Sequence, residues 1–148
     1  MKKVMFVCHG NICRSPMAEF LMKDMVKKQG REAEFFIASS ATSTEEIGNP
    51  PHPGTRKKLA EFNISTAGKQ AVQLTKADYD KYDYFLGMDS MNIRNMLRIF
   101  KDDPQNKVMR LLDFTDVPRD IRDPWYTGNF DETYEDIQEG ILAFLGNL

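Results

Sequence analysis

The sequence predicts a single α/β domain over residues 1–148, built on a four-stranded parallel sheet with helices on both faces. Three observations predict this fold class. A chain of 148 residues has room for one ordinary domain with a real core. Four short runs of β-branched, aromatic and other apolar residues alternate with longer helical segments, the pattern of a parallel sheet with crossover helices. No internal repeat or low-complexity stretch divides the chain.

The first half of the chain begins with a strand at residues 3–8, an apolar run that ends in a glycine-containing loop. Ser15 and Pro16 then predict a helix start, with serine at the N-cap and proline in the first helical position. Gly30 ends this helix, and residues 34–40 form the second strand. We expect the buried face of the helix to consist of Met17, Phe20, Leu21, Met25 and Val26.

The second half continues the alternation of helices and strands. Three prolines and two glycines make residues 47–54 a loop. The elements expected beyond it are helices at 55–62 and 74–79, a strand at 84–88, an Asp89-capped helix to Phe100, a strand at 108–112, a loop at 118–128 and a helix at 131–145. We expect the last helix to bury Tyr134, Ile137, Ile141, Leu142 and Leu145. In such folds ligands bind beyond the carboxyl ends of the strands, and the first strand ends at Cys8.

Charge, hydropathy and cysteine content exclude several classes of protein. With 20 Lys and Arg against 22 Asp and Glu, the net charge of -2 gives no basic footprint for nucleic acid. No segment approaches membrane-spanning length, and the apolar run at 4–7 is too short for a signal peptide, so we expect a cytoplasmic protein with no membrane partner. Only two cysteines, Cys8 and Cys13, are present, which favours reactive thiols over a disulfide scaffold. A structural zinc site would also need His9 and His52 at an unfamiliar spacing, so we expect no metal.

The loop after the first strand carries the chemistry. It consists of Cys8-His9-Gly10-Asn11-Ile12-Cys13-Arg14-Ser15, in which five residues separate a cysteine from an arginine before a helix begins. Five intervening residues can curl so that their N–H groups point inward and form an anion-binding nest, to which the helix adds its positive end. We expect Gly10 to supply the unrestricted backbone position that the curl needs. Arg14 can close over a bound phosphate with its planar pair of donors.

The same field favours the thiolate of Cys8, because helix N-termini and cationic neighbours stabilise the charged form of a cysteine. Ser15 can donate a further hydrogen bond to the sulfur. The loop thus predicts a nucleophile and a dianion receptor in one segment, which suits in-line attack on phosphorus with a phosphocysteine intermediate. The alternative is a buried strand-end cysteine, an ordinary turn and a solvated arginine. An ATP-type phosphate loop is a poorer fit, because it needs a longer segment that ends in Gly-Lys-Ser/Thr.

Four ordered motifs resemble the low-molecular-weight protein tyrosine phosphatases. Val7 to Pro16 resembles the signature loop of that family, and Ser40 to Ser43 with Glu46 to Pro51 resembles its substrate-side loop. Met88-Asp89 with Asn92 is similar to a third segment, and Asp123-Pro124-Trp125-Tyr126 is similar to the general-acid loop. The similarity spans nearly the whole chain. It implies a hydrolase that dephosphorylates phosphotyrosine proteins or small aryl phosphates and uses neither metal nor organic cofactor.

The resemblance also implies roles for individual residues. Cys8 is expected to be the nucleophile, Arg14 to bind the phosphoryl oxygens and Asp123 to protonate the leaving phenolate. The residues expected to hold the loop in shape are Asn11, Ser15 and Ser39. Trp125 and Tyr126 match the aromatic wall beside the substrate ring. The residues alone do not pair Asp123 with Cys8, since Asp-Pro in such a loop is more often a plain turn and an aromatic pair more often core.

Departures from the family pattern lie around the expected cleft. Glu45 stands where many members carry a tyrosine or tryptophan, so one aromatic wall is replaced by a charge. Thr44, His52 and Gly54 also differ, and Trp125 replaces a frequent tyrosine. These changes leave the expected chemistry in place and bear on substrate preference.

Three other functions compete with this one. Thioredoxin-linked arsenate reductases need further cysteines downstream, and none follows Cys13. Protein-arginine phosphatases tend to carry threonine where this loop has Ile12, so Ile12 favours phosphotyrosine. A non-catalytic phosphopeptide-binding module has no use for a thiol in the nest and an acid opposite it.

Two further expectations concern Cys13 and assembly. Cys13 lies in the same loop as Cys8 and is a candidate redox partner for it, with a small buried apolar residue as the alternative. We expect a monomer, with a weak dimer as the alternative assembly.

Overall fold

The computed structural model describes all residues, 1–148, and its sheet has four parallel strands in the order β2-β1-β3-β4. The strands are β1 (Lys2–Cys8), β2 (Phe35–Ala41), β3 (Tyr84–Gly87) and β4 (Val108–Arg110). The predicted α/β class and parallel sheet are confirmed. β1 lies in the middle of the sheet and pairs with both β2 and β3.

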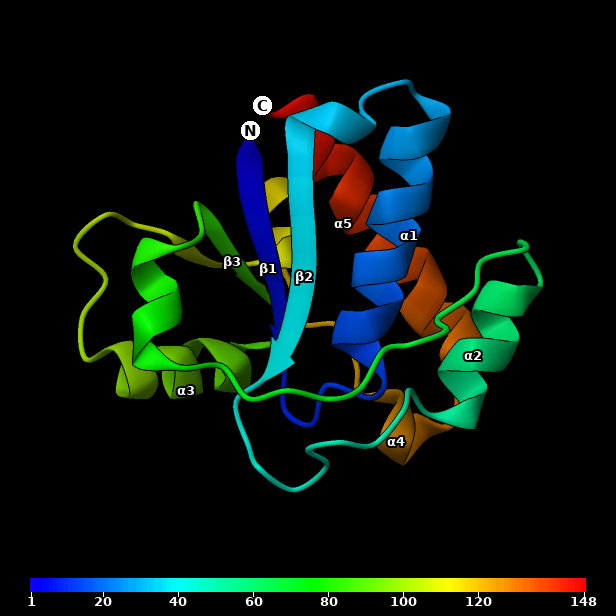
Figure 1. The fold of residues 1–148 in the computed structure, drawn as a ribbon, viewed down its shortest axis with the longest axis horizontal. Helices are drawn as coiled ribbons and strands as arrows, with labels where there is room; N and C mark the ends of the chain where they lie inside the picture. The colour runs from blue at the N-terminus through cyan, green and yellow to red at the C-terminus, as the bar shows by residue number, and fades with distance from the viewer.

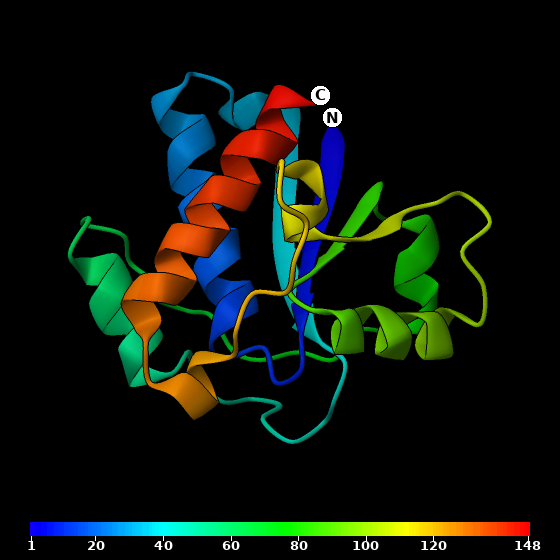
Figure 2. The same ribbon diagram turned by 180° about the vertical axis from the view of Figure 1, so that it is seen from behind.

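Helices cover both faces of the sheet (Figures 1 and 2). On one face lie α1 (Arg14–Lys28) and α5 (Phe130–Gly146), with α2 (Pro53–Ala60) packed against both. On the other face lies α3 (Ser90–Phe100), with the 3₁₀ helix η2 (Lys76–Asp80) beside it. Two short 3₁₀ helices, η1 (Glu32–Glu34) and η3 (Leu111–Phe114), and the small helix α4 (Pro124–Thr127) complete the fold.

The core has two parts because side chains alternate between the faces of β1. Val4, Phe6 and Cys8 belong to the cluster between the sheet and helices α1 and α5. Met5 and Val7 belong to the smaller cluster on the α3 side. Cys8 therefore ends a strand that is buried on both faces, and its position is fixed by the core.

The predicted buried faces of two helices need correction. In α1 the buried apolar residues include Met22, whereas Phe20 and Met25 are only partly buried at the edge of the cluster. In α5 Leu142 is 52% exposed, and Phe144 lies in the core instead. The sequence has apolar residues on both sides of each stripe, so the helical period alone could not fix the rotation of the helix.

Several predicted boundaries were also wrong. The fourth strand ends at Arg110, and residues 111 and 112 already belong to η3. The helix expected at 74–79 is the 3₁₀ helix η2. The loop expected at 118–128 contains α4, which begins at Pro124 with Asp123 as its N-cap. That cap is the pattern of a polar residue followed by proline that starts many helices.

The loops after the strands gather at one end of the sheet, opposite the two chain termini (Figure 1). They are the loop between β1 and α1, the loop after β2 and the segment that leads to α4. No helix of the structure is both long enough and apolar enough to cross a membrane.

Candidate active site

The loop between β1 and α1 is held in shape through its carbonyl groups, which point outward. The carbonyl oxygens of Cys8 and His9 accept from the N–H groups of Thr42 and Ser43, both at 3.0 Å. That of Ile12 accepts from the N–H of His52 at 2.8 Å. The Cys13 carbonyl accepts from the Thr55 hydroxyl at 3.0 Å.

Most N–H groups of the loop, by contrast, have no acceptor within the protein. The amides of Gly10, Ile12, Cys13 and Arg14 donate to no protein acceptor, and the Asn11 amide donates to the Cys8 sulfur at 3.3 Å. The N-cap of α1 makes no side-chain capping bond, so the positive end of the helix is also open toward the loop. Amides without partners at an open helix start are suited to binding an anion, and we call this loop the nest.

The left-handed residue of the curl is Asn11, with φ of 59°, and not Gly10 as predicted. Asparagine tolerates this conformation because its short amide can bond locally. The Asn11 side chain donates to the hydroxyls of Ser15 at 2.7 Å and Ser39 at 3.0 Å, and accepts from the Val72 N–H at 3.1 Å. These three bonds hold the strained residue in place.

Ser15 is not the N-cap that the sequence predicted, because α1 begins two residues earlier than expected and Cys13 takes the cap position. The Ser15 hydroxyl lies 3.0 Å from the Cys8 sulfur. Since this hydroxyl accepts from Asn11, its own proton is free to be donated to the sulfur. The Cys8 sulfur thus has a hydroxyl and an amide donor directed at it.

Arg14 is 2% exposed and reaches across the end of the sheet. Its Nη1 donates to Asp89 Oδ2 at 2.6 Å and to the Ile121 carbonyl at 2.9 Å. Burial opposes the charge of Arg14, but the fields of Cys8, Asp89 and Asp123 outweigh it and raise the pKa of the guanidinium. With Nη1 engaged, Nε and Nη2 are the donors left for an oxyanion.

Asp123 comes from the distant segment before α4 and lies near Arg14. Its Oδ2 is 3.5 Å from Arg14 Nη2, while its Oδ1 accepts from the Trp125 N–H at 3.0 Å as the cap of α4. The structure therefore brings Cys8, Arg14 and Asp123 into one cleft.

The mouth of the cleft is lined by residues of two different kinds. Trp125 and Tyr126 are 57% and 84% exposed, and the His52 ring meets the Trp125 ring edge-on at 5.7 Å. Glu45 also lines the cleft and is hydrogen-bonded to His9 at 2.9 Å. The lining thus combines an exposed aromatic pair with an exposed hydrogen-bonded Glu–His pair.

Comparison with known proteins agrees with the geometry. The family described as "Low molecular weight phosphotyrosine protein phosphatase" matches residues 3–148. The chain belongs to this family.

Its relatives include "Low molecular weight protein-tyrosine-phosphatase YfkJ" of Bacillus subtilis, which is 39% identical over all of this chain and 96% of the relative. The crystal structure of YfkJ superposes with a TM-score of 0.93 and covers 99% of this chain and 94% of that one. The Streptococcus pyogenes phosphatase SP-PTP, 40% identical, gives 0.88 over 100% and 93% of the two chains. DARP, named drosophila arginine phosphatase, is 26% identical and gives 0.89 over 99% and 97%.

Behind the nest, this low-molecular-weight phosphatase has a buried polar network that the sequence analysis predicted only in part. Ser39 lies where expected, and its hydroxyl donates to Glu19 at 2.5 Å. Lys69 donates to the Ser39 carbonyl at 2.9 Å and lies 3.5 Å from Glu19. Burial lowers the pKa of Lys69, and Glu19 opposes that shift. The signal that could have indicated this network is Glu19, a charged residue that lies four positions after Ser15 on a largely buried helix face.

Asp89 is a second residue whose role was missed. The sequence predicted only that it caps α3, which it does by accepting from the Asn92 N–H at 2.8 Å. Its other oxygen binds Arg14 and holds the guanidinium beside the nest. No sequence signal links these two residues, which are 75 positions apart.

Cys13 lies in the loop of this phosphatase, 5% exposed. Burial, together with the neighbouring Cys8 and Asp123, raises the pKa of Cys13 to about 12. Cys13 is therefore a neutral thiol at physiological pH. No group of three or more His, Cys, Asp and Glu side chains is placed to hold a metal ion.

Proposed function

We propose that this chain hydrolyses phosphotyrosine and other aryl phosphate monoesters through a phosphocysteine intermediate. The observation that carries the proposal is the placement of the Cys8 sulfur. It lies under a ring of unpaired amides, with Arg14 beside it and the Asp123 carboxyl on the opposite side of the cleft. A binding module would need the ring but neither the sulfur nor the acid.

In the first step the nest and Arg14 bind three phosphoryl oxygens, and the Cys8 thiolate attacks phosphorus in line with the leaving oxygen. The S–P bond forms while the P–O bond to the aryl group breaks, and the electron pair stays on the phenolate oxygen. Asp123 gives its proton to that oxygen. The amides are already oriented, so they stabilise the charge of the transition state without reorganising.

In the second step water attacks the phosphocysteine. The Asp123 carboxylate, now deprotonated, accepts a proton from the water, and the S–P bond breaks to return the Cys8 thiolate and phosphate. The Ser15 hydroxyl stabilises the thiolate as it leaves. Each group thus serves in both half-reactions, and neither step calls for a cofactor.

The proposal is tested by assaying tyrosine-, serine- and arginine-phosphorylated peptides of one sequence side by side without added metal. We expect the phosphotyrosine peptide to be preferred, since Trp125 and Tyr126 line the cleft where an aromatic ring would lie. Preference for phosphoarginine would favour the activity named for DARP instead. Binding without turnover of any peptide would favour a phosphopeptide-binding module.

Cys13 is proposed to protect Cys8 from irreversible oxidation. Peroxide converts the Cys8 thiolate to a sulfenic acid, and the Cys13 thiol can displace water from it to form a disulfide that a reductant reopens. We expect peroxide-inactivated parent protein to recover with dithiothreitol and Cys13→Ser to recover much less. Cys13→Ala, which adds no buried hydroxyl, serves as the second variant. Equal recovery in all three proteins would remove Cys13 from this role.

Glu45 is proposed to set substrate preference at the mouth of the cleft. Its carboxylate should disfavour peptides with acidic residues beside the phosphotyrosine, by a modest amount because the ion pair with His9 is exposed. We expect Glu45→Tyr to raise kcat/KM on aromatic-rich peptides by restoring an apolar wall. Glu135→Tyr, on the exposed face of α5, is the matched control. An unchanged peptide ranking in Glu45→Tyr would show that position 45 does not contact the substrate.

A further inference from the structure

The segment that leads to Asp123 has no regular secondary structure between η3 and α4, so its path depends on side-chain and backbone anchors. Arg119 binds Asp136 and Glu139 of α5 at 3.0 Å and 2.9 Å. Ile121 donates from its N–H to the Met88 carbonyl at 2.8 Å. Its carbonyl accepts from Arg14, as described above. Between these two anchors lies Asp120.

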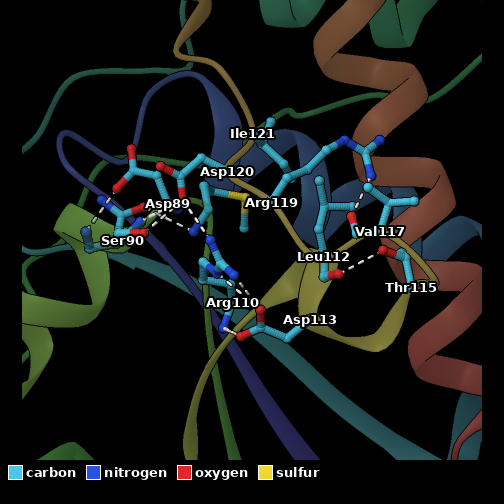
Figure 3. Close-up of polar contacts among 12 residues, drawn as sticks. Asp89, Ser90, Arg110, Leu112, Asp113, Thr115, Val117, Arg119, Asp120 and Ile121 are labelled. Carbon is cyan, nitrogen blue, oxygen red and sulfur yellow. Dashed lines mark hydrogen bonds and ion pairs between the residues drawn. The ribbon is translucent and has the colours of Figure 1, made fainter.

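Asp120 connects the segment to two other elements through one carboxylate oxygen (Figure 3). Its Oδ1 accepts from the backbone N–H and the hydroxyl of Ser90, both at 2.9 Å, and from Arg110 Nη1 at 3.1 Å. Ser90 is the first residue of α3 and Arg110 is the last residue of β4. Arg110 is itself fixed by Asp113, which accepts from its guanidinium at 2.9 Å. Asp120 is thus clamped between a helix start and a strand end.

This carboxylate is not placed to donate a proton to a substrate. Asp120 is absent from the residues that line the cleft, whereas Asp123 is among them. Burial opposes the charge of Asp120, but the hydrogen bonds from Arg110 and Ser90 outweigh it and lower the pKa of the carboxyl. The residue therefore stays charged at physiological pH and serves as an acceptor.

We propose that Asp120 is a positioning residue that, through Ser90 and Arg110, holds the segment before α4 so that Asp123 reaches the leaving oxygen. This inference rests on the proposed role of Asp123 as the general acid. Asp120 lies three residues before Asp123, and it attaches the segment to the same α3 start from which Asp89 holds Arg14. Asp123 and Arg14 are therefore both positioned relative to the start of α3.

The phosphate loop has separate anchors, through Thr42, Ser43, His52 and Thr55. Loss of the Asp120 clamp should therefore displace the acid while leaving the nest and the nucleophile in place. Such a change has a distinctive signature in kcat/KM, which reports the first half-reaction, because only poor leaving groups need the acid in that step. A merely structural role would instead lower turnover of all substrates together, or lower the melting temperature alone.

The test compares Asp120→Ala with the parent on phosphotyrosine and on 2,4-dinitrophenyl phosphate, whose leaving group departs without a proton. We expect kcat/KM on phosphotyrosine, which reports the first half-reaction, to fall about 10-fold, since small displacements of a catalytic group are costly. On the dinitrophenyl ester the change in kcat/KM should stay within about 2-fold. Asp120→Asn keeps an acceptor for Ser90 and should restore part of the loss. Asp24→Ala, which removes the partner of Lys28 on α1, is the matched control.

A double mutant shows whether Asp120 acts through Asp123. If it does, Asp120→Ala should cost nothing further on phosphotyrosine in the Asp123→Asn background, because the group it positions is already gone. Additive losses, equal losses on both esters, or unchanged kinetics in Asp120→Ala would each overturn the inference. If Asp123→Asn by itself lowers kcat/KM equally on both esters, the assignment of Asp123 as the general acid is wrong. If Asp123→Asn affects phosphotyrosine more than the dinitrophenyl ester and Asp120→Ala does not, only the positioning role of Asp120 is refuted.

Discussion

Replacing Cys8 by serine is expected to leave no measurable turnover of any aryl phosphate, while inorganic phosphate still binds. The hydroxyl is a far weaker nucleophile than a thiolate, but the amides that bind the dianion belong to the backbone and are held by outward carbonyl bonds. Calorimetric titration with phosphate, alongside a phosphotyrosine assay, measures both halves of the result. Appreciable hydrolysis by Cys8→Ser would refute the covalent mechanism.

The companion variant Arg14→Ala is expected to lose both binding and rate. In the parent protein the Arg14 guanidinium would bind the substrate phosphate and stabilise the transition state more strongly. We therefore expect kcat of Arg14→Ala to fall by about 10²–10³-fold. Arg14→Lys keeps a charge but loses the planar pair of donors and should recover little. Because Arg14 is buried against Asp89, circular dichroism must show that each variant is folded. Arg98→Ala, on the exposed side of α3, is the control.

Asp123→Asn is expected to lower kcat/KM on phosphotyrosine by about 10²–10⁴-fold, the usual contribution of general acid catalysis to the first half-reaction. Asparagine retains an oxygen that can accept from the Trp125 N–H, so α4 keeps its cap and the wall of the cleft keeps its place. Tyrosine is a poor leaving group, with a pKa of ~10, and needs a proton donor. A nitrophenolate leaves readily without one, so the loss on p-nitrophenyl phosphate should be smaller.

An equal fall in kcat/KM for both substrates would make Asp123 a scaffold residue. The sequence offers Asp116, Asp120 and Asp89 as other candidate donors, and the structure separates two of them from that role. Asp89 is bound to Arg14 and Asp120 to Ser90 and Arg110. A plot of rate against leaving-group basicity for parent and Asp123→Asn decides the matter more finely than two substrates can.

The sequence predicted the parallel sheet correctly, and it predicted a curled loop at a helix start, because both depend on local patterns. Short apolar runs between helical segments indicate parallel strands, and the spacing from Cys8 to Arg14 indicates a curled loop at a helix start. The backbone conformation of individual loop residues could not be predicted from the sequence. Gly10 and Asn11 are both able to relieve a tight curl, and only the bonds from Asn11 to Ser15, Ser39 and Val72 determine which one takes the left-handed conformation.

Contacts between distant segments were beyond the reach of the sequence. Asp123 follows Arg14 by 109 positions, and the resemblance to a family, rather than any pattern in the residues, brought it into the predicted site. The Glu19–Lys69 pair and the bond from Arg14 to Asp89 depend on how distant segments meet in the folded chain. Single charged residues in loops and on helices have many uses, so their partners appear only once the chain is folded.

The outward carbonyls of the phosphate loop have a consequence for inhibitor selectivity. The amides that would bind a phosphate mimic are main-chain groups, and they offer the same surface whatever side chains a related enzyme carries. A compound that gains its affinity from the dianion alone would therefore not discriminate between this enzyme and others with the same curl. Discrimination has to come from the side chains that line the cleft, which include the exposed Glu45–His9 pair together with Trp125 and Tyr126. An inhibitor with an aromatic phosphonate and a cationic arm directed at Glu45 would use both the aromatic residues and the carboxylate that line the cleft.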